Sequence, residues 1–320
     1  MSMLSRAADS LYWMGRYLER AEHTARLVGV NLNLTLDRAP ADAARHWGGL
    51  LTSLSAPPSW STPVMPEPLE RAMVDLANRE AIAACVGTAR ENARQIREEI
   101  SSEMWQEINR LYLHVKRAQP GETGLMAGAH EFLTSVIEGV HLFHGVTDAT
   151  MAHAEGWQFI ELGTYVERAS ATAALLDVQY REYGTDVDRI DGVSEYVEWV
   201  GVLKSCCAFE AYCRHYTADV RASRIAEFLI LNAEFPRSVR FATARMSESL
   251  KAIGSITARS SGNADRLAGK LRASLDYCQM GDISGDLPVF LQGIVRQTAQ
   301  IHLAVHQEYI ASPIESLLPA

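Results

Sequence analysis

A stretch of sequence that occurs twice constrains the fold of this chain more than any other feature. Residues 14–28 recur as residues 162–176, with the same Gly, Tyr, Glu, Arg, Ala, Thr, Ala and Leu at matching positions. Two unrelated helices would share only about one or two such identities, so we interpret the pair as an internal duplication. The chain is therefore predicted to be built from two related halves.

Helical periodicity explains the apolar positions of the repeat but not its charged ones. At about 100° per residue, the apolar side chains of each copy fall on one stripe of a helix. Glu19 and Arg20 lie off that stripe, as do Glu167 and Arg168, yet both copies keep the same pair. Surface ion pairs are worth only a few tenths of a kcal/mol and tolerate exchange of their residues. The pattern leaves three interpretations: buried hydrogen-bonded packing, a ligand-binding or catalytic face, or a plain surface.

The composition is that of an ordinary globular protein. With 320 residues, 48% of them hydrophobic, the chain can bury a large core. Its formal net charge of −9 argues against a broad contact with a nucleic-acid backbone. No apolar stretch reaches the roughly eighteen residues of a membrane-spanning helix, and the five cysteines show no metal-binding or disulfide spacing. We expect a cytoplasmic protein that binds neither nucleic acid nor membrane.

Apolar periodicity predicts an all-α fold, since no segment shows sustained alternation at period two. Prolines concentrated between Pro57 and Pro68 predict a loop. The two halves, residues 1–147 and 148–320, are expected to form a duplicated helical bundle related by a pseudo-twofold, with their Glu-Arg helices facing a shared cleft. Helices are predicted over residues 5–36, 41–54, 68–85, 87–117, 128–146, 150–181, 192–216, 219–233, 236–254, 261–280 and 287–310.

Motifs that would define a metal-dependent enzyme, a serine hydrolase or a nucleotide-binding protein are missing from the sequence. It contains no HExxH, GxSxG, GxGxxG or P-loop sequence. A di-metal helical bundle needs two Glu-x-x-His pairs, and only Glu138 with His141 provides one. A metal held by this pair stays open, but a histidine satisfied by its neighbours is the simpler interpretation. We therefore predict neither a metal nor a cofactor.

Arginine side chains form a second candidate region. Arg90, Arg94 and Arg97 follow the spacing of one helix face. Guanidinium groups bind carboxylates and phosphates through paired hydrogen bonds, so such a row within a cleft would favour an anionic ligand. Pairing with glutamates of the same helix is the alternative. Residues 235–238 resemble a helix start with proline in the first turn, whose free N–H groups could also hold an anion, although a simple helix break explains them equally well.

Together these segments resemble the bacterial alpha-E domain family, named for its helices and its characteristic glutamates. The resemblance rests on residues 3–6, 11–22, 89–94 and 102–105, on Leu162-Gly163 with Glu167-Arg168-Ala169, and on residues 228–230 with 235–239. It implies an all-helical protein found beside, or fused to, a circularly permuted ATP-grasp ligase, often with a transglutaminase-like peptidase and sometimes with a proteasome-like hydrolase. Such systems are thought to make or attach a peptide through amide bonds.

The resemblance implies no established catalytic residue, but it marks candidate ligand-binding positions. Thr164 departs from the family pattern, which has a more polar and often basic residue there, so the second Glu-Arg helix is expected to be less functional than the first. By position, the family's marked residues are Ser5, Arg6, Tyr12, Trp13, Arg16, Glu19, Arg20, Glu22, Arg90, Glu91, Arg94, Glu103, Trp105, Glu167, Arg168, Arg237 and Ser238.

Three functions fit these residues. In the first, the chain is a partner of an ATP-grasp amide ligase, with a transglutaminase-like protein as a further partner. The chain itself binds an anionic peptide or amino-acid ligand. In the second, it is an enzyme in its own right, with Glu19 or Glu167 as a general base whose pKa is raised by a low-dielectric cleft. In the third, it is a helical scaffold in which the Glu-Arg pairs are buried packing devices. The arginines expected to bind the anionic ligand are Arg16, Arg20, Arg90 and Arg94.

Overall fold

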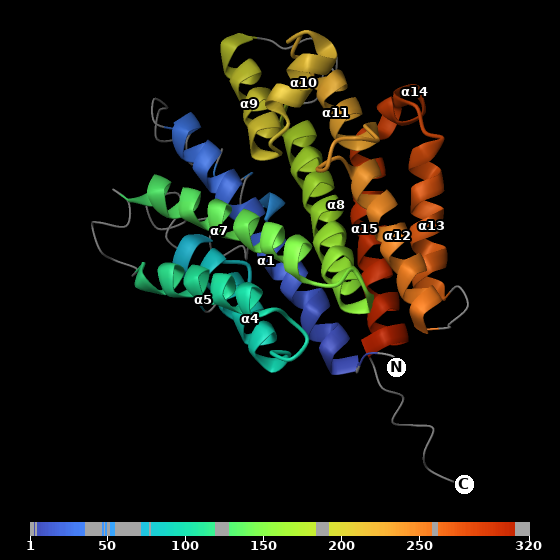
Figure 1. The fold of residues 1–320 in the computed structure, drawn as a ribbon. Helices are drawn as coiled ribbons and strands as arrows, with labels where there is room; N and C mark the ends of the chain where they lie inside the picture. Colours follow the sequence, from blue (N-terminus) through green and yellow to red (C-terminus); the bar gives the residue numbers. More distant parts are fainter. Residues whose placement is uncertain are drawn as a thin grey trace.

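The structure, a computed structural model, is largely helical within the ranges that it describes (Figure 1). No β-strand occurs within those ranges, which confirms the all-α prediction. None of the helices described there is long and apolar enough to cross a bilayer. Most of the predicted helix 41–54 and the predicted loop around Pro57–Pro68 lie outside them. The described residues are Met3, 5–35, 47, 49, 52–54, 72–76, 78–118, 128–183, 192–257 and 262–310.

Two long helices, α1 (Ser5–Thr35) and α8 (Glu155–Tyr183), pack against each other at the centre of the molecule (Figure 1). In the first half, α4 (Ile82–Gln95) and α7 (Ala129–Thr150) pack against α1. The helix α5 (Ser102–Arg117) covers both α4 and α7 without taking a place beside α1. The first half is thus a layer of helices arranged around α1.

The second half repeats this arrangement around α8. Helices α12 (Val239–Thr257) and α15 (Leu287–Val305) pack against α8, and α13 (Asn263–Asp276) packs on both of them. These equivalent contacts agree with a duplication, while the boundary between residues 147 and 148 stays a prediction. The shorter elements are α9 (Gly192–Ser205), α10 (Phe209–Tyr216) and α11 (Ala222–Leu231), which gather at one end of α8 in Figure 1, then α14 (Met280–Ile283), a 3-10 turn (Ser284–Asp286) and a π-helical turn (His306–Ile310).

The two repeat glycines allow the backbones of α1 and α8 to touch. A Cβ atom on Gly15 would overlap the carbonyl oxygen of Ile160, and a Cβ atom on Gly163 would overlap the carbonyl oxygen of Tyr12. Each carbonyl belongs to the residue three positions before the other glycine, so the contact is reciprocal. Only a residue without a side chain permits such an approach. The duplicated glycine therefore serves the packing of the two halves against each other.

The predicted apolar stripes form the core around this crossing. Their side chains are at most 1% exposed, and burying a side chain of the size of leucine contributes about 1.5–3 kcal/mol before the entropy of ordering it is subtracted. The stripe residues are Met14, Leu18, Ala21, Ala25 and Val28 on α1, and Leu162, Val166, Ala169, Ala173 and Leu176 on α8.

The prediction of one helix over residues 87–117 is wrong. Helix α4 ends at Gln95, and α5 begins at Ser102 after a turn. The Ser101 side chain accepts a hydrogen bond of 3.0 Å from the Met104 backbone N–H, which is the geometry of a helix N-cap. Arg97 falls in the turn, so Arg90, Arg94 and Arg97 do not form the continuous row that the spacing predicted.

Two other predicted helices are also interrupted. Residues 192–216 divide into α9 and α10 at Cys207, whose φ of 53° is incompatible with a right-handed helix. Within the predicted helix 68–85, the described residues from 75 to 81 form turns before α4 begins. The apolar pattern reveals neither break, because the apolar residues on either side of it keep helical spacing.

Candidate functional site

The repeated Glu-Arg pairs bind each other across the contact between α1 and α8. Arg20 of α1 donates to Glu167 of α8, with Nε 2.6 Å from Oε1. Arg168 of α8 donates to Glu19 of α1, with Nη2 2.6 Å from Oε2. In both pairs a second guanidinium nitrogen also donates to the carboxylate, the strongest geometry for this type of ion pair. Each half of the chain therefore supplies a glutamate that pairs with an arginine of the other half.

Further charges surround the Glu167 side of this exchange. Arg16 also donates to Glu167, with Nε 2.8 Å from Oε2. Glu80, two residues before α4, accepts from Arg20 at 2.9 Å. Two arginines thus face two carboxylates, and this side of the contact is saturated by its own ion pairs.

The Glu19 side has a different composition. Arg237, two residues before α12, donates to Glu19 at 3.0 Å and to Glu22 at 2.6 Å. Glu22 also accepts from Arg26 at 2.8 Å, and the Nε2 atom of His141 lies 2.9 Å from the same carboxylate oxygen. The residue two positions before α4 is therefore an acid, whereas the residue two positions before α12 is a base.

The buried carboxylates of Glu19 and Glu167 have lowered pKa values, whereas the stand-alone enzyme hypothesis requires a raised one. Burial acts to raise the pKa of Glu19, but its two arginines outweigh that effect and the pKa lies below its ordinary value. The same opposition holds at Glu167, where two arginines bring the pKa down to about 2 despite its burial. The prediction that a cleft raises the pKa of Glu19 or Glu167 is therefore wrong, and neither carboxylate is suited to act as a general base at neutral pH.

Acid is expected to weaken the protein in a window set by these groups. Unfolded glutamate binds a proton near pH 4.5, whereas folded Glu167 does so only near pH 2, so the stability that its ionised form contributes is lost as pH falls from about 4.5 to 2. His23, whose pKa is lowered by burial to about 4 from 6.5, adds an earlier decline between pH 6.5 and 4, because unfolded imidazole takes up a proton that the folded state excludes.

Urea unfolding at a series of pH values checks this expectation. Glu167→Gln removes the carboxyl group that titrates, so its stability should depend less on pH between 4.5 and 2 than that of the unmodified chain. Equal slopes for the two proteins in that window would show that Glu167 is not the group responsible.

A cavity of about 570 Å³, within the usual range for small-molecule pockets, lies beside the Glu19 side of the cluster. It opens between α1, α7, α8 and the segment that leads into α12. Its mouth includes His141 and Asp148, whose side chains are 56% and 69% exposed. The other lining residues are Glu22, Arg26, His144, Thr147, Trp157, Glu161, Thr164, Tyr165, Arg168, Cys207, Phe235, Pro236, Arg237 and Arg245.

Unused hydrogen-bonding groups occur in the wall of this pocket. The Nε2 atom of His144 and the Oγ1 atom of Thr164 are buried and have no hydrogen-bond partner in the described part of the chain. Burial lowers the pKa of His144, so its imidazole is neutral at neutral pH. The Nη1 atom of Arg168 makes one long contact, 3.5 Å from the carbonyl oxygen of Pro236. Buried polar atoms normally find a partner, and these three groups are available to a bound molecule.

The departure at Thr164 helps to explain why a pocket lies on this side. Thr164 occupies the repeat position of Arg16, whose long side chain reaches Glu167 on the opposite side. Thr164 packs beside Gly15 and leaves space next to Arg168. The departure that was expected to make the second Glu-Arg helix less functional thus lies in the wall of the pocket.

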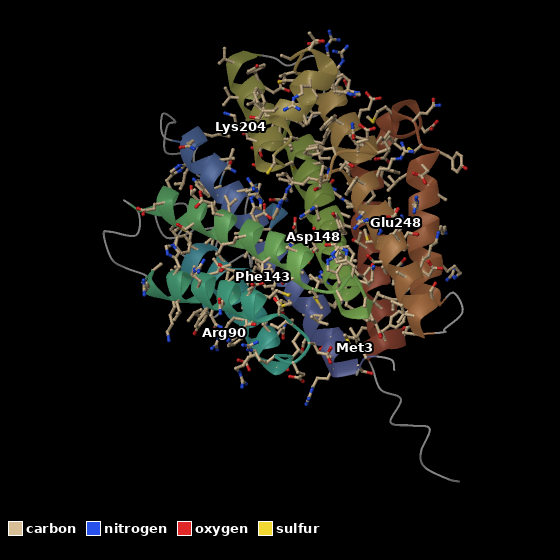
Figure 2. All side chains as sticks on the ribbon, in the orientation of Figure 1. Met3, Arg90, Phe143, Asp148, Lys204 and Glu248 are labelled. Atoms are coloured by element: carbon tan, nitrogen blue, oxygen red, sulfur yellow. The ribbon has the colours of Figure 1, made fainter. Side chains whose placement is uncertain are left out.

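The candidate residues Arg90, Glu91, Arg94, Glu103 and Trp105 belong to a separate surface on α4 and α5. Arg90 lies over the ring of Trp105, 5.3 Å from its centroid. Arg94 is exposed and pairs with Glu91, as the alternative interpretation of the arginine row proposed, and Glu103 is exposed. Figure 2 labels Arg90 on the side of α4 and α5, at a different place from the pocket residue Asp148.

Tyr12 and Trp13 support the saturated side of the cluster rather than the pocket. The Tyr12 hydroxyl lies 3.0 Å from Nδ1 of His302, and the two rings are stacked. Arg16 lies over the ring of Trp13, 4.9 Å from its centroid. These aromatic rings shield the Arg16–Glu167 pair from solvent.

Ser5, Arg6 and Ser238 stand at or near the beginnings of helices. Ser5 is the first residue of α1, and Arg6 beside it is exposed. Ser238 precedes α12, and its hydroxyl accepts a hydrogen bond from the Phe241 backbone N–H at 3.1 Å. The predicted placement of proline within the first turn is wrong, because Pro236 precedes the helix, which begins at Val239.

The open question of a metal at Glu138 and His141 gains no support. Within the described ranges, no group of three or more histidine, cysteine, aspartate or glutamate side chains is placed to hold a metal ion. His141 contacts Glu22 and Arg26 instead.

Among the pocket residues that sequence reasoning missed are Arg26, His144, Trp157, Tyr165 and Arg245. Tyr165 is the repeat tyrosine, so the duplication itself was a signal for it. The others come from α1, α7, α8 and α12, and no local pattern joins residues so far apart in the chain. Only the fold brings them together.

Fold and site together define a class of all-helical proteins whose two central helices are joined by reciprocal Glu-Arg pairs. The chain belongs to the Alpha-E family, described as a predicted alpha-helical domain with a conserved ER motif, and the match covers residues 3–310. Glu19-Arg20 and Glu167-Arg168 are two such dipeptides in this chain, and the cluster gives them a physical role.

Similar proteins come from mycobacteria. An uncharacterized protein of Mycobacterium tuberculosis is 23% identical over 317 residues, which cover 90% of this chain and 35% of that relative. An uncharacterized protein of Mycobacterium bovis gives the same values. The chain therefore spans about a third of the length of these curated relatives. No solved structure shows a significant match.

Proposed function

We propose that the chain is the peptide-binding component of an ATP-grasp-linked amide-ligation or peptide-modification system. The ligand is a peptide or an amino-acid-like molecule whose carboxylate enters the pocket between α1, α7, α8 and α12. The observation that carries this proposal is the unpartnered Nε2 atom of His144, buried in the pocket wall close to Arg168.

The pocket offers a suitable set of groups for a carboxylate. The Nη1 atom of Arg168 can donate to it with a full charge, and Thr164 and the imidazole of His144 can donate from either side. Arg168 is already fixed by Glu19, so little entropy is lost when it binds an anion. The anionic group of the ligand is thereby proposed to lie deep in the pocket.

Other wall residues suit the remainder of a peptide. Trp157, Tyr165 and Phe235 offer aromatic surface for a side chain, while Glu161 and Asp148 offer acceptors for an amine or backbone N–H. The wall therefore carries charges of both signs, which favours a zwitterionic peptide over a purely anionic ligand.

In this proposal a partner protein, not this chain, carries out the enzymatic step. The circularly permuted ATP-grasp ligase expected from the family would form the amide bond, and a transglutaminase-like protein would act on the same peptide. The ion pairs of Glu19 and Glu167 favour a structural task for the Glu-Arg motif, and Arg168 would serve both roles, since it pairs with Glu19 and directs its Nη1 atom to the ligand. Co-purification of the chain with such a ligase from its native cells tests the partnership.

The variant His144→Phe tests the pocket. It keeps the ring and removes the unpartnered nitrogen, so binding of a fluorescein-labelled Glu-Tyr dipeptide with a free carboxyl end should weaken about ten-fold, the effect of losing one hydrogen bond to a charged group. Thermal stability should stay equal or rise, because a buried polar atom without a partner is removed. Fluorescence anisotropy and a melting curve provide the two measurements.

The exposed His130 on the same helix provides a matched control, since His130→Phe should leave dipeptide affinity unchanged. A second pair of variants isolates the hydroxyl: Thr164→Val should weaken binding, whereas Thr164→Ser should preserve it. If His144→Phe and Thr164→Val both bind the dipeptide as tightly as the unmodified chain, the carboxylate pocket is wrong.

A further inference from the structure

A second cavity adjoins the pocket. It has a volume of about 860 Å³ and lies over α12 and α13. Tyr165 and Arg245 belong to the linings of both cavities, so the two are neighbours separated by these side chains. This space is not needed for a ligand of the size of a single amino acid.

Arg245 forms the partition between the two cavities. Its Nη2 atom donates to Glu161 at 3.0 Å on the pocket side, and its Nη1 atom donates to Glu248 at 3.2 Å on the side of the second cavity. The guanidinium group also lies over the rings of Tyr165 and Trp157, 5.7 and 6.0 Å from their centroids. Because this guanidinium group is flat and is held by ion pairs, a bound peptide can pass over it from one cavity to the other.

The second cavity combines positive charge with an exposed aromatic ring. Its lining holds three arginines, Arg240, Arg245 and Arg272, which pair with the two carboxylates of Glu248 and Asp276 and leave one positive charge in excess within that lining. Tyr277 at its edge is 87% exposed, the highest exposure among the large hydrophobic side chains of the described ranges. Acidic and aromatic side chains of a partner would find complementary groups here.

We infer that the pocket and the second cavity form one groove, which binds an acidic and aromatic peptide segment in extended conformation. Its carboxyl end lies against Arg168, and its preceding residues cross Arg245 and continue over α12 to Tyr277. This inference rests on the proposed function and deepens it by naming the substrate class as a peptide of several residues.

Dimensions set the length of that peptide. The groove runs from α8 over α12 to α13, which are successive packed helices and so span two interaxial distances of about 8–10 Å each. An extended peptide covers at most about 3.3–3.6 Å per residue, so roughly six residues reach from the pocket to Tyr277 and two residues do not.

Fluorescein-labelled peptides of alternating glutamate and tyrosine, two or six residues long with free carboxyl ends, test the groove. The six-residue peptide should bind at least about ten-fold more tightly than the dipeptide in fluorescence anisotropy. Tyr277→Ala should remove most of that gain and leave dipeptide affinity unchanged. Tyr196→Ala, which truncates an exposed tyrosine on α9, is the matched control and should affect neither peptide.

The outcomes separate the groove from the pocket. If the dipeptide binds and the longer peptide binds no more tightly, the groove inference is overturned while the proposed function stands. If neither peptide binds, both are overturned. A six-residue peptide with an amidated carboxyl end should bind at least about ten-fold less tightly than its free acid, and equal binding would overturn the proposed direction of the chain.

Discussion

Replacing Glu19 with glutamine is expected to lower the free energy of unfolding by about 3–5 kcal/mol, the cost of leaving a buried charge without its partner. The Glu19 side chain is 1% exposed and neutralises both Arg168 and Arg237. Glutamine has nearly the same shape, so packing is preserved and the loss measures electrostatics. Urea unfolding monitored by circular dichroism gives the value for each protein.

The same substitution at Glu91 is the control for this result. Glu91 pairs with Arg94 on the exposed face of α4, where both groups are well solvated, and Glu91→Gln should leave stability essentially unchanged. Adding Arg168→Gln to Glu19→Gln should cost less than the sum of the two single variants, because both remove one pair. A Glu19→Gln protein as stable as the unmodified chain would mean that water reaches the two arginines and that the cluster is not a buried packing device.

The contrast between Glu19 and Glu91 shows what the sequence could predict about the site. Recurrence of Glu-Arg in both halves indicated that these charges are not merely surface ion pairs. The cluster at the crossing of α1 and α8 agrees with that interpretation. Arg90 and Arg94 were grouped with them because helical spacing and family resemblance were the only guides. Spacing places residues on a face but does not say whether that face meets another helix.

The fold class followed from periodicity, whereas the breaks between helices did not. Residues 87–117 keep helical spacing through the turn that separates α4 from α5, so the apolar pattern alone predicted one helix. The cap at Ser101 was a weak local signal, since serine is also common in helices and loops. The pocket was beyond prediction for a different reason, because its walls come from α1, α7, α8 and α12 and depend on how those helices cross.

The crossing itself gives the second large expectation. Gly163→Ala should destabilise the protein by about 3 kcal/mol, at the upper end of the cost of overpacking, because the new methyl group would overlap the carbonyl oxygen of Tyr12. That oxygen belongs to the backbone of α1 and cannot rotate away, so the helices must separate. Separation would also lengthen the Arg20–Glu167 and Arg168–Glu19 pairs that bridge them.

Gly269→Ala is the control for this experiment, because the change in stability is expected to have the opposite sign there. Gly269 lies within α13, where nothing lies near the position of an added Cβ atom, so alanine should stabilise the protein by about 0.5–1 kcal/mol through its helix propensity. One chemical change is therefore expected to act in opposite directions at two helical glycines, as measured by urea unfolding. Because the contact is reciprocal, Gly15→Ala should behave like Gly163→Ala; stabilisation at either repeat glycine would mean that α1 and α8 do not touch backbone to backbone.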